Sequence, residues 1–168
     1  MFLYAKQKVF TLRDRFRFFD ETEKDVFIVE GKLLSWGKQL TMFDAFGTEV
    51  AFIKQKVFSF LPVYYIYMGG REVAVVRQKL SFFRPHFVLD HTGWDVRGDF
   101  FNHDYDITVD ERLVASVHKR WLSWGDTYEI SIVKDEDAAL VACIVLCIDC
   151  VNAANDAASS SASTSTSN

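Results

Sequence analysis

The chain has 168 residues, of which 49% are hydrophobic and 15% aromatic, and its formal net charge is −4. This length suits one domain, and this composition excludes a disordered or fibrous chain. Every Lys and Arg lies within residues 1–134, where acids nearly balance them, whereas residues 135–168 carry acids and no base. The near-neutral body argues against nucleic acid as a partner.

A short motif recurs along the chain at a period of about 24 residues. The sequence "KQKVF" occurs at residues 6–10 and again at 54–58. Related segments stand at 30–36, 77–83, 97–101 and 118–124. Self-similarity at such a period indicates repeated supersecondary units. We therefore expect six copies of one structural unit ahead of residue 134.

Each unit is predicted to be a pair of antiparallel strands. "EVAVVRQKL" and "LVASVHKRW" are typical long strands, and the shorter ones are "RFRFF", "QLTMF", "YYIY", "HFVL", "YDITV" and "TYEISI". Turn signals occur at residues 44–47, 68–70, 90–93 and 102–104. Six hairpins give roughly twelve strands, and a sheet of that size removes its exposed edges by closing. The predicted fold class is mainly β, a closed antiparallel barrel.

Alternation along the long strands separates an inner face from an outer face. Small residues such as Ala5, Ala51 and Ala74 share one face, which would leave room inside the barrel. Lys and Arg residues share the other face, which we expect to meet water. The 16 Phe residues are expected mainly in the core.

An unbroken apolar run at residues 138–148 predicts a core helix over about 136–151, with Asp135 as its N-cap. The run is apolar all round, so the helix is expected to be buried. It is shorter than the about 20 residues of a bilayer span, so no transmembrane span is predicted. A barrel of this size is too wide for its own side chains to fill, so we expect the helix to thread it. Residues 1–153 would form one domain, and the Ser/Thr/Ala-rich residues 154–168 a flexible tail.

The three cysteines, Cys143, Cys147 and Cys150, lie on one face of this predicted helix. An odd number so closely spaced is no disulfide framework, and buried small hydrophobes are the simpler interpretation. Without a recognisable signal peptide, we expect a cytoplasmic location, peripheral at the membrane if lipid is bound. The oligomeric state is not predicted.

The motifs in their order are "KQKVFTL", "VEGKLLSWG", "AFIKQKVFSFLPVYYIY", "VAVVRQKLSFFRPHFVL", "VRGDFFNHDYDI" and "VHKRWLSWGDTYEISI". Together they resemble the LURP-one-related family, in its short bacterial YxjI-type form, within the tubby-like superfamily. The resemblance covers residues 2 to about 152 and implies a twelve-stranded barrel around a central hydrophobic C-terminal helix, as in the tubby C-terminal domain. Tubby domains bind phosphoinositide head groups through basic residues, and the related scramblases act at membranes. No site residue is carried over from them.

Basic residues on the outer face provide the sharpest hypothesis for a site. They are Lys6, Lys8, Lys32, Lys54, Lys56, Arg77, Lys79, Arg97 and Arg120. Because the third and fourth units contain few acids, the predicted ligand-binding patch is Lys54, Lys56, Arg77, Lys79 and Arg84. Such a patch could hold anionic lipid head groups at about 1 kcal/mol per base. The alternative is a solvated wall whose Lys and Arg stems cover apolar surface.

A second cluster, Asp99, His103, Asp104 and Asp106, could suggest a divalent metal but lacks the spacing of an EF-hand. We expect a hairpin turn there, and we predict no metal, cofactor or catalytic residue. The predicted function is a non-enzymatic intracellular binding or scaffold module with an anionic phospholipid head group or a protein as its partner. The alternatives are an enzyme with a site at a barrel mouth and a membrane-associated, scramblase-like protein.

Overall fold

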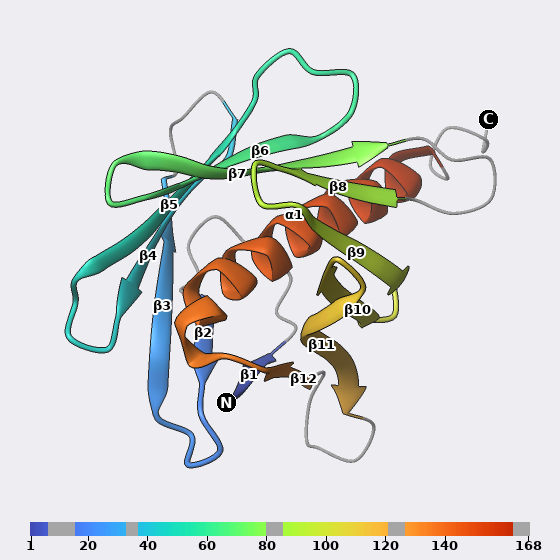
Figure 1. Ribbon diagram of the computed structural model, residues 1–168. Coiled ribbons are helices and arrows are strands. Elements are labelled where there is room, and N and C mark those ends of the chain that lie inside the picture. Colours follow the sequence, from blue (N-terminus) through green and yellow to red (C-terminus); the bar gives the residue numbers. More distant parts are fainter. Residues whose placement is uncertain (7–15, 33–36, 80–85, 121–126, 163–168) are drawn as a thin grey trace.

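The computed structural model describes residues 1–6, 16–32, 37–79, 86–120 and 127–162. In these ranges the chain forms twelve strands, a 3-10 turn and one α-helix (Figure 1). The strands are β1 (Phe2–Lys6), β2 (Phe16–Phe19), β3 (Asp25–Gly31), β4 (Gln39–Asp44), β5 (Glu49–Gln55), β6 (Val63–Met68), β7 (Arg71–Lys79), β8 (His86–Asp90), β9 (Trp94–Asp99), β10 (Asp104–Val109), β11 (Arg112–Arg120) and β12 (Thr127–Ile132). The 3-10 turn, η1, is Asp135–Asp137, and the helix, α1, is Ala138–Ala162.

The strands form one closed barrel in chain order. Each strand pairs antiparallel with the next, and β1 pairs with β12, where Leu3 stands opposite Ile130. The predicted fold class, a closed barrel of roughly twelve antiparallel strands around a C-terminal helix, is confirmed. Closure gives every described strand a partner on both sides, which removes the exposed edges of an open sheet.

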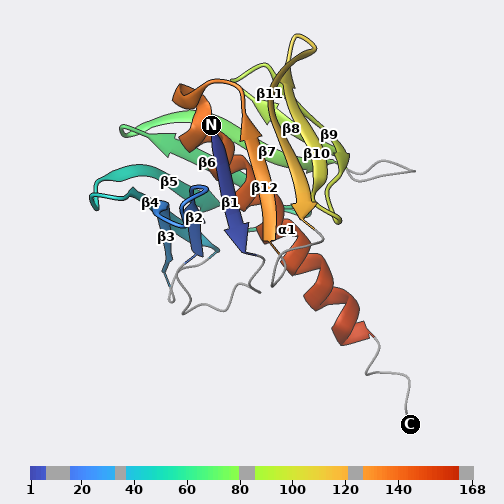
Figure 2. The same ribbon diagram turned by 90° about the horizontal axis from the view of Figure 1, so that it is seen from below.

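Alternating strand direction gives the barrel two distinct mouths. The odd-numbered strands begin at one end, which we call the entry mouth, and finish at the other, the exit mouth. Helix α1 follows β12, so it enters at the entry mouth, and Figure 2 shows its C-terminal part projecting beyond the strands. Because each repeat is one hairpin, equivalent positions of all six repeats are brought to the same mouth.

The helix fills the lumen of the barrel. Every side chain from Val141 to Ile148 is completely buried, including Cys143 and Cys147, and Cys150 is buried as well. On the wall, Ala5, Ala51 and Ala74 are at most 1% exposed and belong to the same core. The predictions of small inward residues and of buried thiols are therefore confirmed.

The observed helix differs from the predicted one at both ends. It begins at Ala138, and the Asp135 carboxylate accepts a hydrogen bond from the Met1 amino group at 2.9 Å. The predicted N-cap at Asp135 is wrong, because Asp135 begins the 3-10 turn instead. At the other end the helix runs to Ala162, past the predicted limit of 151 and into the predicted tail. Alanine has the highest helix propensity, which accounts for the extension.

Three of the described phenylalanines are almost fully exposed, although the sequence places phenylalanine mainly in the core. Phe46, Phe58 and Phe60 are 90–95% exposed. All three lie in connections, at β4–β5 and β5–β6, where no second layer covers the chain.

The stretch Asp135–Asp156 is long and apolar enough to cross a membrane, but 61% of its most apolar part is buried inside the barrel. A core helix that must be apolar on every face has the same composition as a membrane span. Composition alone therefore does not separate the two.

Replacing a helix side chain inside the barrel should destabilise the fold far more than replacing the same side chain on the outer wall. Leu146 is completely buried and Leu113 is 47% exposed. We expect Leu146→Ala to lower the free energy of unfolding by about 2–5 kcal/mol. Leu113→Ala should lower it by less than about 1 kcal/mol. Urea unfolding of both variants measures this, and equal losses would contradict a helix packed in the lumen.

Candidate functional site

The structure places four of the five predicted basic residues near the exit mouth, on β5 and β7 or just beyond them. These two strands flank β6. Lys54 and Lys56 stand at and just after the end of β5, and Lys79 ends β7. The Lys56 amide donates to the Val63 carbonyl at 2.8 Å, and Val63 is opposite Arg77. Lys56 and Arg77 therefore flank one residue of β6, about 10 Å apart across the wall. The three lysine side chains are exposed.

Arg77 differs from the lysines because its charge already has a partner. Its Nε donates to Asp90 Oδ2 on β8 at 2.5 Å, and both side chains are 39% exposed. Arg84, the fifth predicted residue, lies outside the described residues, as does Lys8. Lys54, Lys56 and Lys79 are thus the members of the predicted patch with exposed ammonium groups.

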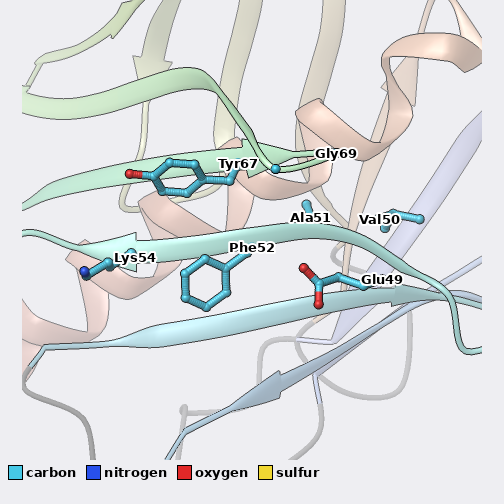
Figure 3. Close-up of a pocket in the computed structure, with 8 residues that line it drawn as sticks. Glu49, Val50, Ala51, Phe52, Lys54, Tyr67 and Gly69 are labelled. Carbon is cyan, nitrogen blue, oxygen red and sulfur yellow. The ribbon is translucent and has the colours of Figure 1, made fainter.

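A hollow of about 400 Å³ lies on the outer wall next to Lys54 (Figure 3). The Phe52 and Tyr67 rings line it from β5 and β6, with centroids 6.2 Å apart and planes tilted by 37°. Glu49 lies at one end and Lys54 at the other (Figure 3). The described lining contains one carboxylate and no histidine, a combination suited to contact rather than to proton transfer.

Charge is divided unequally between the two mouths. This holds for the described charged side chains, other than histidine, that lie in the connections or at the first two or last two positions of a strand. At the entry mouth these are Asp20, Glu21, Glu23, Asp25, Asp44, Glu49, Glu72, Asp90, Asp95, Asp110, Glu111, Asp135, Glu136 and Asp137, with Lys24, Arg71, Arg112 and Lys134. At the exit mouth they are Arg17, Lys32, Lys38, Lys54, Lys56, Lys79 and Lys119, with Glu30, Asp99 and Asp104. The helix adds Asp156 beyond the exit mouth. An anionic surface would attract the exit mouth and repel the entry mouth.

A buried polar cluster lies inside the barrel near the exit mouth. Asp149 interrupts the apolar helix, and its side chain is 11% exposed. One carboxylate oxygen is 2.8 Å from His103 Nε2, and the other accepts a short hydrogen bond from the Tyr128 hydroxyl. The His103 and Tyr128 rings stack with centroids 4.5 Å apart. The cluster joins the helix to the β9–β10 connection and to β12.

The β9–β10 connection is shaped to present His103 inward. Gly98 has φ +140°, and a side chain there would come within 2.5 Å of the Asp104 carbonyl oxygen. Asp99 accepts hydrogen bonds from the Asn102 amide and side chain, at 3.2 and 2.8 Å. His103 itself adopts a left-handed φ of 51°. The predicted hairpin turn is confirmed, and its backbone directs the imidazole towards the helix.

Burial controls the protonation of the groups around this cluster. Burial, reinforced by the nearby Asp149 charge and the hydrogen bond to it, raises the pKa of Tyr128 well above its usual value. The Tyr128 hydroxyl therefore remains a donor at neutral pH. Burial also raises the pKa of Cys150 to about 11, although the Lys38 ammonium opposes this rise. Burial raises the pKa of the Cys143 and Cys147 thiols as well. All three thiols therefore remain protonated at neutral pH and are poor nucleophiles.

The His103, Asp104 and Asp106 side chains, which could have suggested a metal site, each contact a different partner. His103 contacts Asp149, Asp104 is 2.8 Å from His118 Nδ1, and Asp106 accepts from the Ser116 hydroxyl at 2.6 Å. Among the residues that the structure describes, no group of three or more His, Cys, Asp or Glu could hold a metal ion.

Sequence reasoning did not identify the Asp149 cluster. One signal was present, because a carboxylate inside an otherwise apolar helix requires a buried partner. The sequence could not identify that partner, since His103 and Tyr128 are 46 and 21 residues away. The exposed Phe58 and Phe60 were missed for a different reason, because aromatic residues are usually expected in a core.

Comparisons with known proteins agree with the architecture. A family model described as LURP-one-related matches residues 1–149. The chain is 38% identical over 149 residues to the Bacillus subtilis protein YxjI, described as uncharacterized, covering 89% of this chain and 92% of that protein. An Arabidopsis thaliana protein solved by X-ray methods superposes with a TM-score of 0.66, covering 90% of each chain at 16% identity. At that identity the structural likeness shows the fold alone.

Removing the Asp149 carboxylate should be costly, because His103 and Tyr128 would lose their buried partner. We expect Asp149→Ala to lower the free energy of unfolding by about 2–6 kcal/mol, because two buried polar groups are each left without a partner. The matched control is Asp104→Ala, which breaks the exposed pair with His118 and should cost at most about 1 kcal/mol. Chemical unfolding measures both variants, and similar small losses would show that the cluster contributes nothing.

Stability should decline in alkali, because burial raises the pKa of the thiols and tyrosines only in the folded chain. The pKa of the Cys150 thiol is 9.0 in the unfolded chain, and burial raises it to about 11 in the folded chain. Its contribution is therefore complete below pH 9 and is lost as the pH rises to about 11. Urea unfolding at about pH 8 and about pH 10.5 measures the decline. Cys150→Ala should remove only the part of the decline that this thiol contributes, because Cys143 and Cys147 are also buried with raised pKa values. A pH-independent stability would refute the explanation.

Proposed function

The chain belongs to the LURP-one-related family, and from this premise we propose that it is a non-enzymatic binding module for anionic phospholipid head groups. The head groups contact Lys54, Lys56 and Lys79 on the outer wall near the exit mouth. In this proposal the protein is cytoplasmic and associates peripherally with a membrane.

The observation that carries the proposal is the grouping of exposed lysines at the ends of β5 and β7. Each lysine near an anionic membrane contributes about 1 kcal/mol of binding free energy, so three lysines supply a weak, reversible attraction. The acidic entry mouth adds repulsion at the opposite end, which favours one orientation. Arg77 has a smaller part, since its contact with Asp90 offsets its charge.

An enzyme is the less favoured alternative. The histidine–carboxylate pair that could move protons is His103–Asp149, and these side chains are 3% and 11% exposed. A protein partner has one specific observation in its favour, the hollow between Phe52 and Tyr67, whose open aromatic lining could receive a side chain.

Binding to vesicles should depend on anionic lipid and on salt. We expect cosedimentation with phosphatidylcholine–phosphatidylserine vesicles that weakens between about 50 and about 300 mM salt, as exposed charges are screened. The double variant Lys54→Glu/Lys56→Glu should reduce partitioning by at least about 30-fold, because each lost lysine removes about 1 kcal/mol and each glutamate adds repulsion. Binding that ignores both salt and lipid charge would refute the proposal.

The matched control changes net charge by the same amount at the entry mouth. Lys24→Glu/Lys134→Glu also replaces two exposed lysines, and we expect it to bind nearly as the unmodified chain does. Equal losses in the two double variants would mean that net charge, rather than this patch, controls binding. Unchanged melting temperatures would confirm that all variants are folded.

A further inference from the structure

The β5–β6 connection, residues 56–62, exposes two aromatic side chains next to the lysine patch. Phe58 is 90% exposed and Phe60 is 95% exposed. Covering such a ring is worth about 1.5–3 kcal/mol, so an exposed pair marks a contact surface rather than an ordinary loop. Phe101, in the β9–β10 connection at the same mouth, is 49% exposed.

The backbone of this connection also departs from an ordinary loop. Phe58 has φ 60°, a left-handed conformation that bulky residues rarely adopt. Such conformations cluster at binding sites and switch regions, where the surrounding structure maintains them. The strain therefore agrees with a connection selected for how it presents its side chains.

Lysines and phenylalanines follow one another where the chain leaves the barrel at the exit mouth. Lys54 lies within β5, Lys56 follows its end, and Phe60 lies farther along in the connection. A bilayer has the same order, because phosphates lie outside the boundary with the acyl chains. Aromatic rings next to lysines thus match an anionic lipid surface in both charge and depth.

We propose that the β5–β6 connection is a membrane-inserting tip, in which Phe58 and Phe60 enter the boundary between head groups and acyl chains while Lys54 and Lys56 contact lipid phosphates. This inference rests on the proposed function and adds an insertion site and an orientation to it. The C-terminal part of α1 projects at the exit mouth (Figure 2). In this proposal the barrel is therefore tilted, and it meets the bilayer with the β5–β7 side of that mouth rather than with the whole rim.

A fluorescent label at residue 60 tests insertion directly. All three native cysteines are free and buried, so a cysteine introduced by Phe60→Cys is the thiol that reacts in the folded chain. An environment-sensitive nitrobenzoxadiazole label there should shift its emission to the blue and brighten several-fold with phosphatidylcholine–phosphatidylserine vesicles. The matched control is Phe46→Cys, since Phe46 is also 95% exposed but lies in the β4–β5 turn at the entry mouth. Its label should not respond.

Unlabelled serine variants supply a second measurement. Phe60→Ser should weaken vesicle partitioning by about tenfold while leaving its dependence on salt unchanged, because the lost contribution is apolar. Phe46→Ser should bind as the unmodified chain does. Weaker binding of Phe60→Ser, together with unchanged binding of Phe46→Ser, would support the membrane-inserting tip.

The outcomes separate this inference from the proposed function. If the chain binds anionic vesicles with the expected salt dependence but the label at residue 60 does not respond, insertion is refuted and surface binding remains. Equal responses at residues 60 and 46 would also refute it, by showing adsorption without orientation. If the chain binds no anionic vesicle, the proposed function and the insertion fail together.

Discussion

Filling the lumen of a twelve-stranded wall with one helix is the constraint on which the other features depend. The helix must be apolar around its whole circumference, and every side chain from Val141 to Ile148 is buried accordingly. The wall must also leave room for it, which alanines such as Ala51 and Ala74 provide. Because the helix occupies the interior, the described charged residues other than those of the Asp149 cluster lie on the outer wall and at the two mouths.

An apolar helix in an apolar tube has no strong preference for one position along the axis. Asp149 supplies that preference, because its carboxylate has buried partners only where His103 and Tyr128 meet it. Asn152 adds a second polar contact to the same connection, donating to the Phe100 carbonyl at 2.9 Å. Buried polar groups that set register are well attested, and they cost stability when a partner is removed. The cluster thus links the core to the exit mouth, where the candidate lipid contacts lie.

The strands, the closure and the core helix could be predicted because each has a local signal. A repeated hairpin implies equal strand directions at equivalent positions, and an apolar run implies burial. The pairing of Arg77 with Asp90 and the Asp149 cluster could not be predicted, since both depend on registers between separate strands. The exposure of Phe58 and Phe60 was missed because composition alone assigns aromatics to the core. The helix beyond residue 151 was missed because Ser and Ala composition was taken to indicate a tail, although alanine favours helix.

Hydrogen exchange measured by mass spectrometry, with and without anionic vesicles, tests most directly whether the helix stays in the barrel during docking. The account predicts that amides from Val141 to Val151 remain protected to the level of global unfolding in both conditions. In the β5–β6 connection, the amides of residues 56–61 should gain protection only with vesicles. Loss of protection in Val141–Val151 on adding vesicles would contradict the account, because it would mean that the helix leaves the lumen to enter the membrane.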